Sequence, residues 1–130
     1  MPAFFSTDWA HAVCARLNAS EGYRQAAETW EGDVAFVATA DGDAPARTVW
    51  LDLHRGACRG AAGTLPEHAP AFTISATPAV WRDVLAGKTD PVMGMMLGKL
   101  KVDGSMATIA ANARAAKALV AEAASVPADG

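Results

Sequence analysis

Apolar and polar positions follow two different periods along the chain, which divide it into helical and extended segments. Near the N-terminus Trp9, Val13 and Leu17 recur every four residues, so they share one face of a helix that begins near Thr7. Ser20 is a suitable N-cap for a second, short helix. The pattern predicts a pair of amphipathic helices at this end of the chain.

The period changes to two after residue 33, where short apolar segments are separated by turn residues. Asp41-Gly42-Asp43 can form a turn, so residues 34–39 and 47–53 are expected to pair as a hairpin. Small residues over 56–63 allow a third short strand, and the alternation over 72–75 predicts a fourth. This part of the chain is therefore expected to form a sheet.

The second strand has two chemically different faces. Val49, Leu51 and Leu53 lie on one face, which we expect to point to the core. Trp50 lies on the opposite face, where it is available to a partner protein.

Two helices after the fourth strand begin at proline. Thr77-Pro78 and Asp90-Pro91 each place an N-cap before a proline at the first helical position. The first helix carries Trp81 and Leu85 on its apolar side. Alternating charged and apolar residues over 99–103 then predict a fifth strand with one solvated face.

The second of these helices is rich in methionine. Met93, Met96 and Leu97 are spaced three and four residues apart and are expected to form its buried side, whereas Met95 points off that face. Methionine adapts to irregular gaps, so such a cluster serves as core filler or as the wall of an apolar site. Periodicity alone does not distinguish a filled core from a tunnel.

The C-terminal segment predicts one long amphipathic helix over 106–124, which carries Ile109 and Leu119 on its apolar side. Residues 124–130 have little to pack and are expected to fray. No linker divides the chain, so residues 1–130 are expected to be a single domain.

Composition and charge exclude several classes of partner. The chain is 52% hydrophobic and 19% charged, with a net charge of -3 and no basic stripe, so nucleic acid is not an expected partner. No segment approaches the roughly 20 apolar residues of a membrane span, and a basic leader is absent from the first residues. A cytoplasmic location is expected.

Candidate catalytic and metal-binding residues do not assemble into a set. Cys14 and Cys58 lie far apart in the sequence, and neither has a partner at metal-ligand spacing. His54 with Cys58 could be read as an activated thiol, but the local sequence is strand and turn. Gly87-Lys88-Thr89 lacks the upstream glycine of a phosphate loop and follows a helix. We expect no enzymatic activity, no cofactor and no metal.

Three segments in order resemble the sterol carrier protein type-two family of lipid-binding domains. They are "WAHAVCARLNASEGYRQAAETWEGDVAFV", "VWLDLHRGAC" and "FTISATPAVWRDVLAGKTDPVMGMMLGKLKVDGSM". The last is the most specific, with a Gly-x-x-Asp-Pro step followed by Gly-Lys-Leu-Lys-x-x-Gly. The resemblance implies an α+β domain with a five-stranded mixed sheet, helices over one face and an apolar tunnel between them.

The resemblance also implies a function. It indicates non-enzymatic binding and carriage of fatty acyl chains, sterols or similar lipids, without a cofactor. It implies that the tunnel is lined by apolar side chains from the sheet and helices, namely Leu51, Leu53, Phe72, Ile74, Trp81, Leu85, Met93, Met96, Leu97, Ile109 and Leu119. Burial of such ligands is stabilised by about 0.8 kcal/mol per CH2 group before the entropy of binding is subtracted.

Two departures from the family pattern change the expected partners. The chain ends Ala128-Asp129-Gly130 and not in a peroxisomal Ser-Lys-Leu, so peroxisomal import is not expected. It is also acidic where the best-known carriers are basic, so contact with membranes is expected to be transient at most. The alternatives are a closed-core interaction module, with Trp50 at a partner contact or in a homodimer, and an enzyme that uses Cys58 or a histidine.

Overall fold

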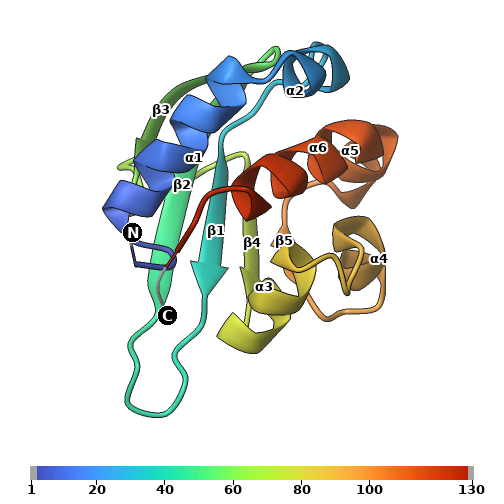
Figure 1. Ribbon diagram of the computed structural model, residues 1–130. Coiled ribbons are helices and arrows are strands. Elements are labelled where there is room, and N and C mark those ends of the chain that lie inside the picture. The colour runs from blue at the N-terminus through green and yellow to red at the C-terminus, as the bar shows by residue number, and fades with distance from the viewer. Residues whose placement is uncertain (1–2, 129–130) are drawn as a thin grey trace.

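Five strands form a mixed sheet, and six helices lie over one of its faces, in the computed structural model of residues 3–128 (Figure 1). The strands are β1 (Val34–Ala38), β2 (Arg47–His54), β3 (Ala57–Ala62), β4 (Phe72–Ala76) and β5 (Lys101–Asp103). The helices are α1 (Thr7–Ala19), α2 (Glu21–Ala26), α3 (Pro78–Leu85), α4 (Pro91–Met96), α5 (Met106–Ala111) and α6 (Ala113–Ala124). The α+β class, the five strands and the mixed sheet predicted from the sequence are confirmed.

The sheet has the strand order β3-β2-β1-β4-β5, with β1 and β4 parallel and the other pairs antiparallel. Its register places Val34 opposite both Leu51 and Phe72, and Phe36 opposite Ile74. Because paired residues point to the same side of a sheet, these side chains form adjacent apolar rows under the helices. The prediction for the inner face of β2 is confirmed.

Side-chain caps begin the N-terminal helices where the sequence indicates. Ser6 caps α1, with its Oγ accepting from the Trp9 N–H at 3.1 Å, and Ser20 Oγ caps α2 by accepting from the Tyr23 N–H at 3.0 Å. Leu17 on α1 is fully buried. Helix α1 packs against β2, β3 and α6, whereas α2 packs mainly against α6.

The fifth strand is shorter than the alternation predicts. Residues 99 and 100 belong to a turn, because the N–H groups of Lys99 and Leu100 both donate to the Gly94 carbonyl, at 2.9 and 3.2 Å. Pairing with β4 begins only at Lys101. This turn packs Leu100, which is 1% exposed, beneath α4.

The predicted C-terminal helix is interrupted, which corrects the expectation of one continuous helix. Asn112 separates α5 from α6, and its Nδ2 donates to the Thr108 carbonyl at 2.8 Å. An asparagine that bonds to nearby backbone competes with the helical ladder. The break lets Ile109 of α5 and Leu119 of α6 approach the same interior space.

The C-terminal segment packs further than expected. Val126 is 9% exposed and Ala128 packs against the core, although little packing was expected for this segment. Residues 129 and 130, for which fraying was also expected, lie outside the described part of the chain.

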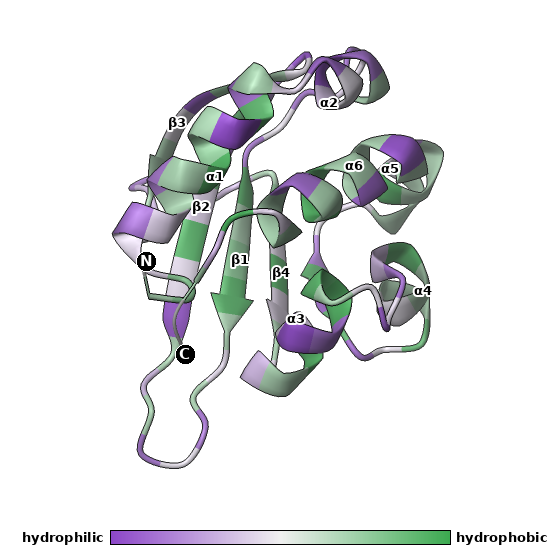
Figure 2. Ribbon diagram, in the orientation of Figure 1, coloured by the Kyte–Doolittle hydropathy of each residue, from purple (hydrophilic) through white to green (hydrophobic). Residues whose placement is uncertain are grey.

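The core lies between the sheet and the helical layer. Figure 2 shows hydrophobic residues both in the strands and in the helices that lie over them. Helix α6 is central to this layer, because it packs against each of the five other helices. Within residues 3–128, no helix is long and apolar enough to cross a membrane.

Candidate functional site

An apolar cavity of about 50 Å³ lies between the sheet and helices α3 to α6. Side chains from both layers line it, together with residues of α2 and its following loop. The lining residues are Tyr23, Trp30, Val34, Phe36, Leu53, Phe72, Ile74, Trp81, Pro91, Met95, Leu100, Ile109, Ala115, Ala116, Leu119 and Val120. No charged side chain lines this larger cavity, so its chemistry suits an apolar ligand.

A smaller apolar cavity of about 30 Å³ lies between α1, the sheet and α6. Its lining residues are Phe5, Trp9, Val13, Phe36, Val49, Leu51, Trp81, Leu85, Leu119, Val120 and Ala123. Phe36, Trp81, Leu119 and Val120 line both cavities. The two spaces are therefore neighbours with a common wall.

The ring of Trp81 is held firmly in this common wall. Its Nε1 donates to the Val37 carbonyl at 2.9 Å, and its ring meets Phe36 edge to face at 5.5 Å and Phe5 at 5.4 Å. The hydrogen bond and the two ring contacts fix the orientation of the indole. Trp81 and Phe36 thus set the division between the larger and the smaller cavity.

The cavities are small for a lipid. The larger one has about a third of the volume, roughly 150 Å³, of an engineered apolar cavity that takes up benzene. A long acyl chain therefore requires the two spaces to join or the helical layer to move outward. Met95 lines the larger cavity and, as an unbranched thioether, can repack as that happens.

The sequence-predicted lining residues divide into three groups. Those at the larger cavity are Leu53, Phe72, Ile74, Trp81, Ile109 and Leu119. Leu51 and Leu85 line the smaller cavity. Met93, Met96 and Leu97 line neither; they are 51%, 68% and 66% exposed.

The predicted orientation of α4 is therefore wrong. Gly94 faces inward, so close to Leu100 that a Cβ at residue 94 would lie 2.6 Å from Leu100 Cδ1. This approach buries the side of α4 formed by Pro91 and Gly94, and turns Met95 partly inward. Met93 and Met96 point to the surface as a consequence.

Sequence reasoning also missed several lining residues. Tyr23, Trp30 and Leu100 carry apolar signals typical of any core, and nothing local shows that they border a space. Ala115 and Ala116 are the more informative pair, because two small residues on a buried helix face leave room beside them. Burial raises the pKa of Tyr23, so its phenol stays neutral in this wall.

The two cysteines lie near each other, and Cys58 is not activated. Cys14 Sγ donates to the Cys58 carbonyl at 3.4 Å, and Cys58 Sγ donates to the Gly60 carbonyl at 3.3 Å. Burial, followed by the adjacent Cys14 thiol, raises the pKa of Cys58. A thiol with a raised pKa is a poor nucleophile, which argues against the alternative of an enzyme that uses Cys58.

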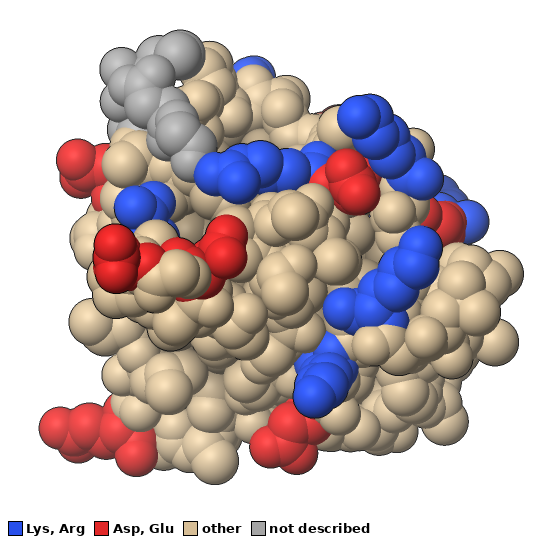
Figure 3. All heavy atoms as spheres, turned by 90° about the horizontal axis from the view of Figure 1, so that it is seen from below, with Lys and Arg blue, Asp and Glu red and all other residues tan. Residues whose placement is uncertain are grey.

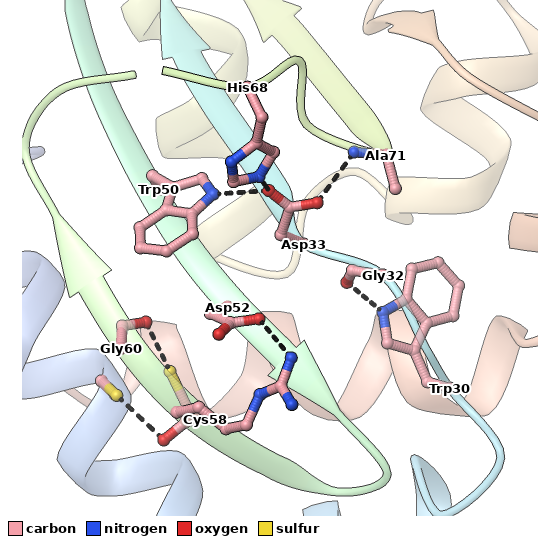
Figure 4. A network of polar contacts seen from close by, with 11 residues as sticks. Trp30, Gly32, Asp33, Trp50, Asp52, Cys58, Gly60, His68 and Ala71 are labelled. Carbon is pink, nitrogen blue, oxygen red and sulfur yellow. Dashed lines mark hydrogen bonds and ion pairs between the residues drawn. The ribbon is translucent and has the colours of Figure 1, made fainter. Parts of the chain in front are cut away.

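A polar network on the opposite face of the sheet includes Trp50, which lies on that face as the sequence predicts (Figure 4). Asp33 Oδ2 accepts from Trp50 Nε1 at 2.8 Å and lies 2.7 Å from His68 Nε2, and Asp33 Oδ1 accepts from the Ala71 N–H at 2.9 Å. Burial by itself raises the pKa of Asp33, but these hydrogen bonds and the charge of His68 outweigh it and lower that pKa. Trp50 is half-buried and hydrogen-bonded in this network, and its place in a partner contact stays a prediction.

Charges lie outside the cavities. In the view from below, many lysine and arginine side chains gather on one half of the surface (Figure 3). Away from the cavity linings, Lys117 Nζ of α6 lies 3.4 Å from Asp90 Oδ2 at the start of α4. Residues 3–128 hold no group of three or more His, Cys, Asp or Glu side chains arranged to bind a metal.

A family model described as the SCP-2 sterol transfer family matches residues 11–117. The chain belongs to this family. Its members are lipid-binding carrier domains, and the resemblance inferred from the three sequence segments is confirmed. No curated protein matches the chain significantly.

Solved structures agree with membership of the SCP-2 family. A crystal structure of sterol carrier protein 2 is 41% identical, with a TM-score of 0.88 over 95% of this chain and 99% of that one. A solution structure of a Thermus thermophilus protein, described as possibly a sterol carrier protein, is 40% identical, with a TM-score of 0.89 over 99% and 93%. An Aedes aegypti sterol carrier protein solved with palmitate is 16% identical and shares the fold, with a TM-score of 0.58 over 92% and 97%.

Proposed function

We propose that this SCP-2 family protein binds one apolar ligand at a time, a fatty acyl chain or a sterol-like lipid, between its sheet and its helical layer. The observation that carries the proposal is the wholly apolar lining of the larger cavity in a chain of this family. The contact residues are those that line the larger and smaller cavities, with the common wall of Trp81 and Phe36 between them.

The proposed action is carriage without chemistry. The cavity lining supplies no nucleophile or base, and the nearby Cys58 is a buried thiol of raised pKa. Burial of apolar surface supplies most of the affinity, and non-directional contacts give a broad choice of ligand. Some properties stay predictions: transient membrane contact, a cytoplasmic location, a single domain over residues 1–130 and the formation of a homodimer.

Native mass spectrometry and probe displacement test the proposal. Freshly purified protein should carry co-purified lipid, and palmitate should displace a fluorescent fatty-acyl probe with a saturable curve. Ala116→Leu fills the larger cavity and should weaken binding by about tenfold. Ala121→Leu, at an exposed position of the same helix, is the matched control and should leave binding unchanged.

Two results would contradict the proposal. One is the absence of both co-purified lipid and saturable binding of acyl and sterol probes. The other is equal affinity in Ala116→Leu and Ala121→Leu, which would place the ligand outside the larger cavity.

A further inference from the structure

Trp9 has a buried hydrogen-bond donor without an acceptor. Its side chain is 4% exposed, and no acceptor among residues 3–128 lies within hydrogen-bond distance of its Nε1. The three other indoles are all paired: Trp30 donates to the Gly32 carbonyl at 2.9 Å, Trp50 to Asp33 at 2.8 Å and Trp81 to the Val37 carbonyl at 2.9 Å. Buried indole N–H groups normally have a partner, so Trp9 is an exception that requires an explanation.

The position of Trp9 connects it to the proposed ligand site. Trp9 lines the smaller cavity and also an outer hollow of about 320 Å³, so it stands between the interior and the surface. Phe5 stacks on its ring at 5.2 Å, and Phe4 lies 5.7 Å away. The indole is therefore fixed in place, and its N–H cannot turn to another acceptor.

Water is a poor partner for this donor on the cavity side. A buried water is retained when two to four polar groups bind it. The side chains that line the smaller cavity are apolar, and the N–H of Trp81, the other indole there, already donates to Val37. An acceptor that arrives on an apolar ligand avoids this difficulty, because the rest of the ligand fills the apolar space.

We propose that Trp9 Nε1 binds the polar end of the ligand, donating to an oxygen at the end of an apolar chain. This rests on the proposed function. The chain extends from Trp9 through the smaller cavity and past Trp81 and Phe36 into the larger one. Fatty acids and fatty alcohols share the required chemistry, an acceptor oxygen at one end of an unbranched chain.

A ligand without an acceptor oxygen cannot make this bond. Palmitate and hexadecanol should therefore each bind more tightly than hexadecane.

The test compares palmitate, hexadecanol and hexadecane on the wild-type protein and on Trp9→Phe, which keeps an aromatic ring and removes the donor. Trp9→Phe should lose about three- to tenfold in affinity for palmitate and hexadecanol and keep its affinity for hexadecane. Trp30→Phe is the matched control, because Trp30 lines the larger cavity but its N–H is already paired. It should shift the three affinities by similar factors.

A second measurement does not depend on the variant being stable. In the indole region of a ¹H–¹⁵N spectrum of the wild-type protein, palmitate should move the Trp9 N–H resonance downfield, and hexadecane should not. Two results would overturn this inference and leave the proposed function intact. One is an equal loss of affinity for all three probes in Trp9→Phe. The other is a Trp9 N–H resonance that does not move when palmitate binds. If the wild-type protein binds none of the three probes, both the proposed function and this inference fail.

Discussion

Helices α1 and α4 cover opposite ends of the same sheet, but they are attached to it in very different ways. Helix α1 has thirteen residues and packs against β2, β3, α2 and α6. Asn18 at its end bonds to both the N–H and the carbonyl of Cys58 in β3, at 2.9 and 2.8 Å. This end of the helical layer is fixed by buried apolar side chains and by paired backbone groups.

Helix α4 has six residues and packs mainly against α6. A partly exposed ion pair joins Asp90, at its start, to Lys117 in the helical layer. Weakly attached elements open at lower free-energy cost than the rest of a domain. The larger cavity is the one that α4 borders, so we infer that this cavity widens by movement of α4.

The largest expected difference between the two regions is in the cost of removing a large side chain. Leu17→Ala in α1 should lower the free energy of unfolding by about 2–5 kcal/mol, because it leaves a cavity in a fully buried position. Met95→Ala in α4 should lower it by only about 1 kcal/mol, since Met95 is half-buried and already borders a space. Urea denaturation measures both, and equal costs would refute the contrast.

A second difference concerns the polar attachments. Asn18→Ala leaves the N–H and carbonyl of Cys58 without this partner and should cost about 1–3 kcal/mol of stability. Lys117→Ala removes a partly exposed ion pair and should cost less than about 1 kcal/mol. Repeating both measurements in high salt supplies the control: only the effect of Lys117→Ala should disappear, because salt screens exposed charges. A larger loss from Lys117→Ala would show α4 to be the firmer helix.

The two helices also differ in how well the sequence predicted them. The start of α1 and the caps of α3 and α4 follow from local rules, since Ser, Thr or Asp accepts from the backbone N–H three residues later. The buried side of α1 follows from its period over thirteen residues. In α4, apolar residues occupy most of six positions, so the period cannot select a face. The contact between Gly94 and Leu100, a residue outside the helix, determines which face of α4 is buried.

Other features of the candidate site depend on contacts between distant segments. Asn112 breaks the last helix through a bond to Thr108 that competes with an otherwise good helical sequence. Leu51 and Leu85 were expected in one tunnel, but Trp81 and Phe36 place them beside the smaller cavity. The Trp9 N–H has no partner within residues 3–128, and this shows only when every neighbour is in place. Sequence therefore predicted the layers and many wall residues, and tertiary packing determined the division of the space.

Acid should loosen α4 before α1. The N–H of Met93 donates to Asp90 Oδ1 at 3.0 Å, and this bond, with a smaller opposing effect of burial and a further contribution from Lys117, lowers the pKa of Asp90 from 3.8. A carboxyl with a lowered pKa stabilises the fold above its ordinary pKa, and that stability is lost as the pH falls through the lower native pKa. Helix α1 is capped by Ser6, which does not titrate in this range.

Hydrogen exchange near pH 5 and pH 3, corrected for intrinsic rates, measures this third difference. Between pH 5 and pH 3 the opening free energy of the α4 amides should fall by less than about 1 kcal/mol, while that of the α1 amides stays constant. Asp90→Ser is the control, because serine still caps the helix but carries no ionisable group in this range. Its α4 should be less protected near pH 5 and insensitive to acid. An equal loss of protection in both helices would point to global unfolding instead.

The smallest expected effect separates the two sides of α4 itself. Met93→Ser with Met96→Ser alters two exposed side chains and should change the free energy of unfolding by no more than about 0.5 kcal/mol, with palmitate affinity unchanged. Met95→Ser places a hydroxyl in the apolar wall and should weaken palmitate binding several-fold. Palmitate titrations followed by native mass spectrometry compare the two variants. If the double variant lost more affinity than Met95→Ser, the ligand would contact the outer side of α4, and the cavity beneath it would not be the principal site.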